Sequence, residues 1–200
     1  AGEMASRIFV ETTVAVFTAL QAASQEATVN CVRHAFGLSN HKILTQAASC
    51  PENKGMGCTA ELLAFHDDGF VLGHVGDSRT YRFRRGRLEQ LTEDHTLVQQ
   101  QFAEGLIDAQ GARSHPLRNV ILRAVGLQGD LSLDLLHGLL VPGDIFLLCS
   151  DGLSDMLSDE QISDVLTTGT DIRAIAAALV ERANAAGGDD NITVVMAAFN

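Results

Sequence analysis

Gly143-Asp144-Ile145-Phe146-Leu147-Leu148-Cys149-Ser150-Asp151-Gly152 is the stretch around which the rest of this chain is organised. Its five apolar residues, Ile145 to Cys149, stand between Pro142-Gly143 and Ser150-Asp151-Gly152. A short apolar run bounded by turn residues predicts a strand that is buried on both faces and ended by a turn. Asp151 then supplies a carboxylate at the exit of the strand, where Gly152 lets the backbone bend sharply and approach a ligand closely.

Asp151 has two interpretations at this point. A carboxylate held at the rim of a core suits a hard cation, because such cations take oxygen ligands. Asp also opens turns and caps helices, and for this segment alone an ordinary turn is the better explanation. The choice depends on what other segments bring to the same rim.

The composition favours one domain with a substantial core. The chain has 200 residues, 46% of them apolar, and a net charge of −11. No apolar run approaches the ~20 residues of a membrane-spanning helix, no signal peptide is visible, and the negative charge argues against nucleic acid or an anionic membrane as partner. The four cysteines lack CxxC spacing and indicate reduced thiols, so a cytoplasmic location is expected; they are Cys31, Cys50, Cys58 and Cys149.

Hydrophobic periodicity and turn signals divide the chain into helices and strands. Helices are expected over residues 3–24, 26–48, 93–104 and 171–186, with Gly37 and Ser39-Asn40 as candidate breaks in the second. Ser158 and Gln161 predict a capping box. Strands are expected over residues 58–66, 70–75, 79–83, 87–91, 131–137, 145–149 and 191–199. Helices, then hairpin-linked strands, then helices and a strand predict an α+β fold with antiparallel sheets.

Two of the connecting segments carry further expectations. In the strand at 79–83, Tyr81 and Phe83 alternate with Thr80, Arg82 and Arg84, which predicts one buried and one solvated face. Those arginines suit an anionic partner, although a solvated strand face explains them more simply. Residues 105–119 are polar, irregular and interrupted by Gly and Pro, so they are a candidate lid.

Three Asp-containing turns stand at strand boundaries, namely Gly76-Asp77-Ser78-Arg79, Ser150-Asp151-Gly152 and Gly188-Asp189-Asp190-Asn191. Strand ends can converge on one rim of a layered fold. Three carboxylates there would repel each other, but with Mg²⁺ or Mn²⁺ they become ligands. Such a site activates water and clamps a phosphoryl group, which makes a metal-dependent phosphohydrolase a candidate beside ordinary turn chemistry.

Other chemistries lack their signatures in this sequence. No Cys is followed six positions later by Arg, and no GxxxxGK[ST], GxSxG or HExxH motif occurs. His66-Asp67 enters a predicted hairpin turn and is interpreted as incidental. The Gly55-Met56-Gly57 loop could cradle a phosphate, but a tight entry into a strand needs glycine equally.

Seven segments in order resemble the metal-dependent protein serine/threonine phosphatases, the PP2C-like or PPM family, and its bacterial branch most closely. Each is weak alone, and the ordered set spans nearly the whole chain. The segments are Ala1-Gly2-Glu3-Met4-Ala5-Ser6, Gly55-Met56-Gly57-Cys58-Thr59-Ala60, Gly73-His74-Val75-Gly76-Asp77-Ser78-Arg79, Leu91-Thr92-Glu93-Asp94-His95, His115-Pro116-Leu117-Arg118-Asn119, Ser150-Asp151-Gly152-Leu153 and Gly187-Gly188-Asp189-Asp190-Asn191-Ile192-Thr193-Val194.

The resemblance implies a single domain over residues 1–200, an α/β/β/α sandwich of two antiparallel sheets flanked by helices. It implies two Mn²⁺ or Mg²⁺ ions, with Asp151 and Asp190 as metal ligands. Asp77 looks like the residue that, with Asp151, holds a third and weaker metal in bacterial members. No protein side chain would be the nucleophile, since the family uses a metal-bound water. Residues 96–118 would form a flap that shapes substrate access.

One departure from the family concerns the start of the chain. Members carry an Asp-Gly-Met-Gly-Gly segment whose Asp bridges the two metals, and this sequence opens just after it, at Ala1-Gly2-Glu3. We therefore expect an N-terminally incomplete domain, either a fragment, which we favour, or a divergent form. Family members also carry strands before that segment. A chain without them would expose sheet edges and apolar faces, so reduced stability and a tendency to associate are also expected.

The resemblance predicts a phosphatase that hydrolyses phosphoserine and phosphothreonine on proteins, with substrates of a Ser/Thr kinase as partners. The alternative is a pseudophosphatase, in which the fold serves as a binding or regulatory module. Asp77, Asp151 and Asp190 favour the enzyme, because a binding module does not need three such carboxylates. Loss of the N-terminal Asp, if natural, favours the alternative.

Overall fold

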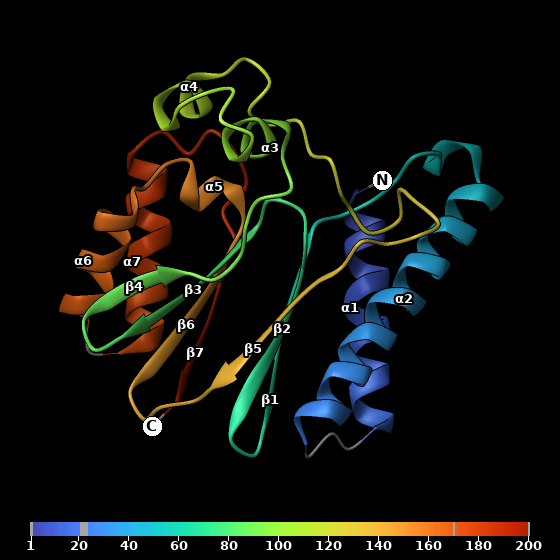
Figure 1. The fold of residues 1–200 in the computed structure, drawn as a ribbon, viewed down its shortest axis with the longest axis horizontal. Helices are drawn as coiled ribbons and strands as arrows, with labels where there is room; N and C mark the ends of the chain where they lie inside the picture. The colour runs from blue at the N-terminus through green and yellow to red at the C-terminus, as the bar shows by residue number, and fades with distance from the viewer. Residues whose placement is uncertain (1, 21–23, 170, 200) are drawn as a thin grey trace. The chain divides into compact units, whose positions relative to one another are not determined.

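The computed structural model describes residues 2–20, 24–169 and 171–199, which form two compact units (Figure 1). Unit 1 comprises Ala1–Gly76 and Asp94–Leu139, and unit 2 comprises Asp77–Glu93 and Leu140–Asn200. None of the helices in the described ranges is long and apolar enough to cross a membrane.

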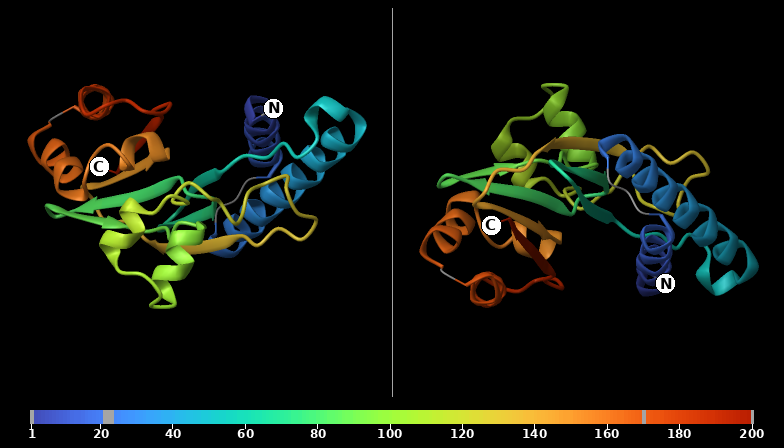
Figure 2. Two further views of the ribbon diagram at one scale, coloured as in Figure 1. Left: turned by 90° about the horizontal axis from the view of Figure 1, so that it is seen from above. Right: turned by 90° about the horizontal axis from the view of Figure 1, so that it is seen from below.

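Unit 1 is built on a three-stranded antiparallel sheet in the order β1-β2-β5. The strands are β1 (Ala60–His66), β2 (Gly69–Val75) and β5 (Asp134–Leu139). Two long helices, α1 (Gly2–Ala19) and α2 (Gln25–Ser49), lie side by side, and α2 packs on β1 and β2 (Figures 1 and 2). The core of unit 1 includes Phe9 and Phe36, whose rings meet edge to face with centroids 4.9 Å apart. A short 3-10 helix, η1 (Pro51–Asn53), follows α2.

The helices of unit 1 differ from the sequence-based expectation at two places. Ser24, expected to end the first helix, caps the second instead, because its Oγ accepts the N–H of Ala27 at 3.3 Å. The helix α1 ends at Ala19, and residues 21–23 of the expected helix lie outside the described residues. The expected break at Gly37 and Ser39-Asn40 is wrong, since α2 continues through both.

Asn40 explains why a polar residue does not interrupt α2. It is buried, and its Oδ1 accepts the N–H of Gly126 at 2.7 Å while its Nδ2 donates to the Gln128 carbonyl at 2.9 Å. A buried amide is tolerated when its hydrogen bonds are made. Asn40 therefore anchors a loop of unit 1 to the helix, a role that periodicity could not reveal.

Two short helices of unit 1 occupy the segment predicted to be a flap. The helix α3 (Leu97–Ala103) falls within the expected helix at 93–104. The helix α4 (Ala109–Ser114) was not expected; it is capped by Asp108, whose Oδ1 accepts the N–H of Gly111 at 2.7 Å. The segment is thus partly helical and makes side-chain caps of its own.

Unit 2 is built on a four-stranded antiparallel sheet in the order β4-β3-β6-β7. The strands are β3 (Arg79–Arg84), β4 (Arg87–Gln90), β6 (Asp144–Cys149) and β7 (Val194–Phe199). The apolar run Ile145 to Cys149 therefore forms a strand, as predicted, and this strand lies between β3 and β7 in the sheet. Within it Phe146, Leu147 and Cys149 are buried, whereas Ile145 and Leu148 are partly buried.

Three helices complete unit 2. They are α5 (Asp151–Ser154), α6 (Asp159–Thr168) and α7 (Ile172–Ala185), of which α7 packs on β7 and on α6 (Figure 1). The predicted capping box is confirmed, because Ser158 and Gln161 exchange side-chain bonds with each other's N–H groups. The apolar stripe of the last helix enters the core through Ile175, Leu179 and Ala183.

The predicted solvated face of β3 is wrong at Thr80. Its side chain is fully buried, and its backbone N–H donates to Thr92 Oγ1 at 3.1 Å. The predicted class is confirmed, since both sheets are antiparallel, each has helices packed on it, and the fold is α+β.

Candidate functional site

The three predicted turns lie at one edge of the four-stranded sheet, namely the edge formed by the ends of its strands and not by an outer strand. Arg79, the first residue of β3, pairs with Cys149, the last residue of β6. Cys149 in turn pairs with Val194, the first residue of β7. Asp77, Asp151 and Asp190 flank these three strand ends in sequence, so antiparallel pairing carries all three turns to the same edge of unit 2.

Ser150 ties two of these turns together. Its N–H donates to the Thr193 carbonyl at 3.1 Å, and its Oγ accepts the N–H of Thr193 at 3.0 Å. The same hydroxyl donates to the Asn191 carbonyl at 3.0 Å. The Ser of Ser150-Asp151-Gly152 is therefore a clasp that fixes this turn against the segment that follows Asp190.

Gly152 allows the two turns to touch. A Cβ at this position would lie 2.5 Å from the Asn191 carbonyl oxygen and 3.4 Å from that of Asp190. Real Cβ atoms essentially never come within 3.0 Å of such an atom, so any larger residue would push the turns apart. The glycine is needed here for close approach to the backbone of the opposite turn, whereas the sequence had suggested close approach to a ligand.

Gly152→Ala is expected to destabilise the chain by about 1–3 kcal/mol, because the added methyl group must displace the backbone of the opposite turn. Thermal unfolding measures this as a lower Tm. Gly37→Ala is the matched control, since Gly37 is also helical but has open space around its Cβ position; it should be stabilising by about 0.5–1 kcal/mol. Equal Tm values for the two variants would contradict the packing argument.

The carboxylates at this edge differ in environment. Asp151 is partly buried at the first position of α5, and its Oδ1 accepts the N–H of Gly152 at 2.8 Å. Asp190 is exposed, and its Oδ1 accepts the N–H of Asn191 at 2.6 Å. Asp77 is partly buried before β3. Ser150, not Asp151, occupies the N-cap position of α5, so the helix-capping interpretation of Asp151 is wrong.

A complete metal-ligand set is not assembled by the described residues. Within residues 2–20, 24–169 and 171–199, no three or more His, Cys, Asp or Glu side chains form a group that could hold a metal ion. The structure thus brings together the backbone turns that bear the three aspartates. The assignment of Asp77, Asp151 and Asp190 as metal ligands stays a prediction.

Arg79, the last residue of the first Asp-containing turn, hydrogen-bonds a buried tyrosine of unit 2. Arg79 Nη1 donates to the Tyr81 hydroxyl at 3.3 Å, and that hydroxyl lies 3.3 Å from Asp159 Oδ1. Burial raises the pKa of Tyr81 well above its ordinary value, against the opposing effect of Arg79. Tyr81 therefore stays protonated and donates to Asp159, which links β3 to the start of α6.

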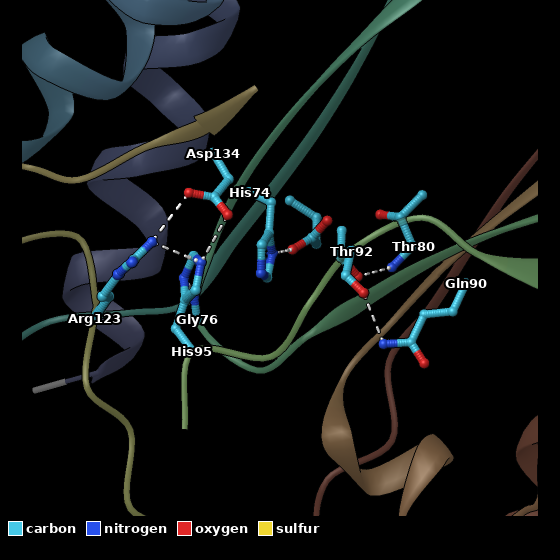
Figure 3. A network of polar contacts seen from close by, with 9 residues as sticks. His74, Gly76, Thr80, Gln90, Thr92, His95, Arg123 and Asp134 are labelled. Atoms are coloured by element: carbon cyan, nitrogen blue, oxygen red, sulfur yellow. Dashed lines mark hydrogen bonds and ion pairs between the residues drawn. The ribbon is translucent and has the colours of Figure 1, made fainter. Parts of the chain in front are cut away.

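In unit 1, the residue before Asp77 is held by His95 (Figure 3). The Gly76 N–H donates to His95 Nδ1 at 3.1 Å, and the His95 N–H donates to the Gly76 carbonyl at 2.7 Å. Gly76 has a φ of +123°, and a Cβ there would lie 2.4 Å from Thr59 Cγ2. Both the backbone conformation and the space therefore require glycine at this position of the motif.

The bond from Gly76 also fixes the protonation state of His95. Because Nδ1 accepts a hydrogen bond, the proton of the neutral ring lies on Nε2, which is 3.2 Å from Asp134 Oδ2 and 3.0 Å from Arg123 Nη1. Burial lowers the pKa of His95, and the nearby charges of His74 and Arg123 act in the same direction against the effect of Asp134. A neutral ring at neutral pH matches its role as an acceptor for Gly76.

Further polar residues, some buried and some partly exposed, extend this network in unit 1 (Figure 3). Arg123 Nη1 donates to Asp134 Oδ1 at 3.0 Å. The rings of His74 and His95 lie with centroids 4.5 Å apart, and His74, which is fully buried, contacts Glu61. Sequence reasoning noted His74 and His95 within motifs but missed Glu61, Arg123 and Asp134, because no local spacing relates residues on separate strands and loops.

The sequence profile of the family described as protein phosphatase 2C matches residues 1–195. The chain belongs to the protein phosphatase 2C family. The family identified from the seven segments is thereby confirmed.

Two curated members illustrate the similarity. The serine/threonine phosphatase stp of Listeria welshimeri is 36% identical over 161 residues, which are 80% of this chain and 64% of that protein. The protein phosphatase PhpP of Streptococcus pneumoniae is 37% identical over 181 residues, or 88% of this chain and 73% of that protein. The chain thus spans about two thirds of the length of these phosphatases.

Solved structures of family members share the fold. The serine/threonine phosphatase of S. agalactiae matches with a TM-score of 0.94 and 32% identity, over 100% of this chain and 82% of that one. The catalytic domain of the serine/threonine protein phosphatase PstP, solved in complex with two manganese ions, has a TM-score of 0.85 and 34% identity, over 98% of this chain and 80% of that one. The predicted PP2C-like fold is confirmed by these matches.

Proposed function

We propose that this chain is the catalytic part of a metal-dependent protein phosphatase that removes phosphate from phosphoserine and phosphothreonine on proteins. The observation that carries the proposal is the Ser150 clasp, which holds the turns of Asp151 and Asp190 against each other at one sheet edge. Membership of the protein phosphatase 2C family and the two manganese ions of the PstP catalytic domain support it.

The donor chemistry at this edge fits Mn²⁺ or Mg²⁺. The three aspartates offer carboxylate oxygens, which are the ligands that hard divalent cations prefer. Asp151 and Asp190 would hold the two principal ions, and Asp77 with Asp151 would hold a third, weaker one. When bound, such ions activate water and neutralise charge on the phosphoryl oxygens.

The contribution of the chain itself is to position these groups. Ser150 and Gly152 keep the backbone turns of Asp151 and Asp190 in contact, so both carboxylates start from neighbouring turns. His95 holds the Gly76 peptide that leads into Asp77. The segment 96–118, with its two short helices, would shape access for the substrate as a flap.

The test is Mn²⁺-dependent hydrolysis of a phosphothreonine peptide, measured with this chain and with the full natural protein. We expect phosphate release by the full protein that needs Mn²⁺ or Mg²⁺ and stops when a chelator is added. Release that continues unchanged in the presence of the chelator would overturn the metal mechanism. A folded full protein that releases no phosphate would instead favour the pseudophosphatase.

A further inference from the structure

The hairpin between β3 and β4 gathers an unusual share of the positive charge of the chain. Of 14 Lys and Arg residues in a chain of net charge −11, five stand within residues 79–87. Three of these arginines contact neighbours of their own unit: Arg79 donates to Tyr81, Arg82 pairs with Glu89, and Arg84 pairs with Asp144.

The other two arginines lie at the tip of the hairpin. Arg85 and Arg87 are exposed, and in the described part of the chain neither makes an ion pair or a side-chain hydrogen bond. Glu89 and Asp144, the nearby carboxylates, are already engaged by Arg82 and Arg84. The tip therefore presents two uncompensated cations on an acidic molecule.

The backbone at the tip disfavours an arginine. Arg84 and Arg87 pair across a two-residue loop in which Arg85 has φ 52° and Gly86 has φ 78°. Two positive φ values define a type I′ turn, whose first position prefers Asn, Asp or Gly. Arg85 is the one non-glycine residue with positive φ in the described ranges. Strain retained at one residue points to a role for its side chain.

The tip lies at the opposite end of β3 from the candidate site, and both belong to unit 2. The six residues of β3 at ~3.3 Å each separate the two ends by ~20 Å. An extended peptide covers that distance with about six residues. A protein segment whose phosphorylated residue lies at the candidate site can therefore reach the tip with residues about six to eight positions away from that residue.

We propose that Arg85 and Arg87 form a docking site for an acidic segment of the phosphoprotein substrate, about six to eight residues from its phosphorylated residue. This inference rests on the proposed function for the identity of the partner. Nucleic acids and anionic membranes are disfavoured as partners because the net charge of −11 repels extended polyanions, whereas a short acidic segment meets only the local cations.

The variants for the test are Arg85→Asn, Arg87→Gln and the double change. Asn suits the first position of a type I′ turn, so Arg85→Asn should keep the fold and raise Tm by about 1–3 °C. The matched control is Arg33→Gln, which removes one exposed positive charge from α2 in the other unit. If Arg85→Asn folds normally, a loss of peptide binding by this variant is not caused by a loss of structure.

The first measurement is an NMR titration with a phosphate-free peptide that carries a cluster of Glu residues. We expect saturable shifts of the amide signals of residues 85–87, weakened by salt, absent with a Gln-substituted peptide, and lost in the double variant but not in Arg33→Gln. This readout does not need enzyme activity. Shifts elsewhere only, or stronger shifts with single-stranded RNA or with anionic vesicles, would overturn the proposal.

The second measurement compares phosphothreonine peptides with Glu or Gln at positions six to eight from the phosphorylated residue. The Glu peptide should have a KM about 3- to 10-fold lower, with kcat unchanged, and the double variant should lose the difference.

Equal KM values in an active enzyme would refute the docking site and leave the proposed function standing. Binding at the tip without hydrolysis would refute the proposed function alone. Aggregation of the double variant with unchanged peptide binding would show that the arginines only protect the edge strand β4.

Discussion

Asp190→Asn and Asp151→Asn should each lower Mn²⁺-dependent hydrolysis of a phosphothreonine peptide by at least about 10²-fold. A metal ion contributes several kcal/mol to charge stabilisation in the transition state, and each 1.4 kcal/mol is about tenfold in rate. Replacing one carboxylate by a neutral amide removes a charged ligand while keeping the shape of the side chain. Kinetics over a range of Mn²⁺ concentrations measure the loss, and partial recovery at high Mn²⁺ would mark it as weakened metal binding.

Asp189→Asn is the matched control for this prediction. Asp189 is the exposed neighbour of Asp190, so the variant makes the same change of charge one residue away. Activity should stay within about threefold of the parent, because the family pattern assigns the ligand role to the Asp that directly precedes Asn191. If Asp189→Asn and Asp190→Asn lose activity equally, the loss follows the general charge of the turn, and the assignment of Asp190 as the ligand is wrong.

The sequence could predict the location of these turns because local signals carry that information. The apolar runs before Ser150 and after Asn191 define strands, and antiparallel pairing then brings Asp151 and Asp190 to one edge. The Ser150 clasp was not foreseen, since a serine before Asp-Gly has no pattern that names Thr193 as its partner. The ligand assignment came from the family resemblance and stays untested by the geometry.

Pairings between distant side chains explain most of what the sequence did not predict. Asn40 and Gly126 are 86 positions apart, and Arg84 and Asp144 are 60 positions apart. Periodicity reports which face of an element is apolar, and a polar residue on that face looks like a defect or a turn. Asn40 was accordingly a candidate helix break, although its buried amide is what holds the loop of Gly126.

Asp144→Ala should destabilise unit 2 by about 2–4 kcal/mol, which corresponds to about 5–12 °C in Tm. Asp144 is the first residue of β6, and its side chain has no exposed surface. Its two oxygens accept Arg84 Nε and Nη2, each at 2.6 Å, and one of them also accepts the Val141 N–H at 2.9 Å. Truncation leaves the guanidinium and that N–H without their acceptor. The estimate stays below that of a fully buried pair because the Arg84 side chain is 27% exposed.

Glu89→Ala is the matched control, because Glu89 also pairs with an arginine of β3. The Arg82–Glu89 contact measures 2.6 Å, but the Glu89 side chain is 52% exposed. Water solvates such a pair well, so its loss should cost no more than about 1 kcal/mol. Chemical denaturation of both variants measures the contrast. Similar destabilisation by the two changes would show that burial of Asp144 contributes nothing beyond an ordinary surface pair.

The dependence of stability on pH separates the charge of Asp144 from its packing. Burial raises the pKa of Asp144, but the hydrogen bonds from Arg84 and Val141 outweigh it and hold the pKa below its ordinary value. A carboxyl with a lowered pKa stabilises the folded state above the pKa of the unfolded chain, about 3.9 for Asp. That contribution is lost as pH falls from there through the folded-state pKa. The stability difference between the parent and Asp144→Ala should therefore be constant from about pH 5 to 8 and shrink below about pH 4. A difference that persists unchanged into acid would mean that the carboxylate acts through its shape and not through its charge.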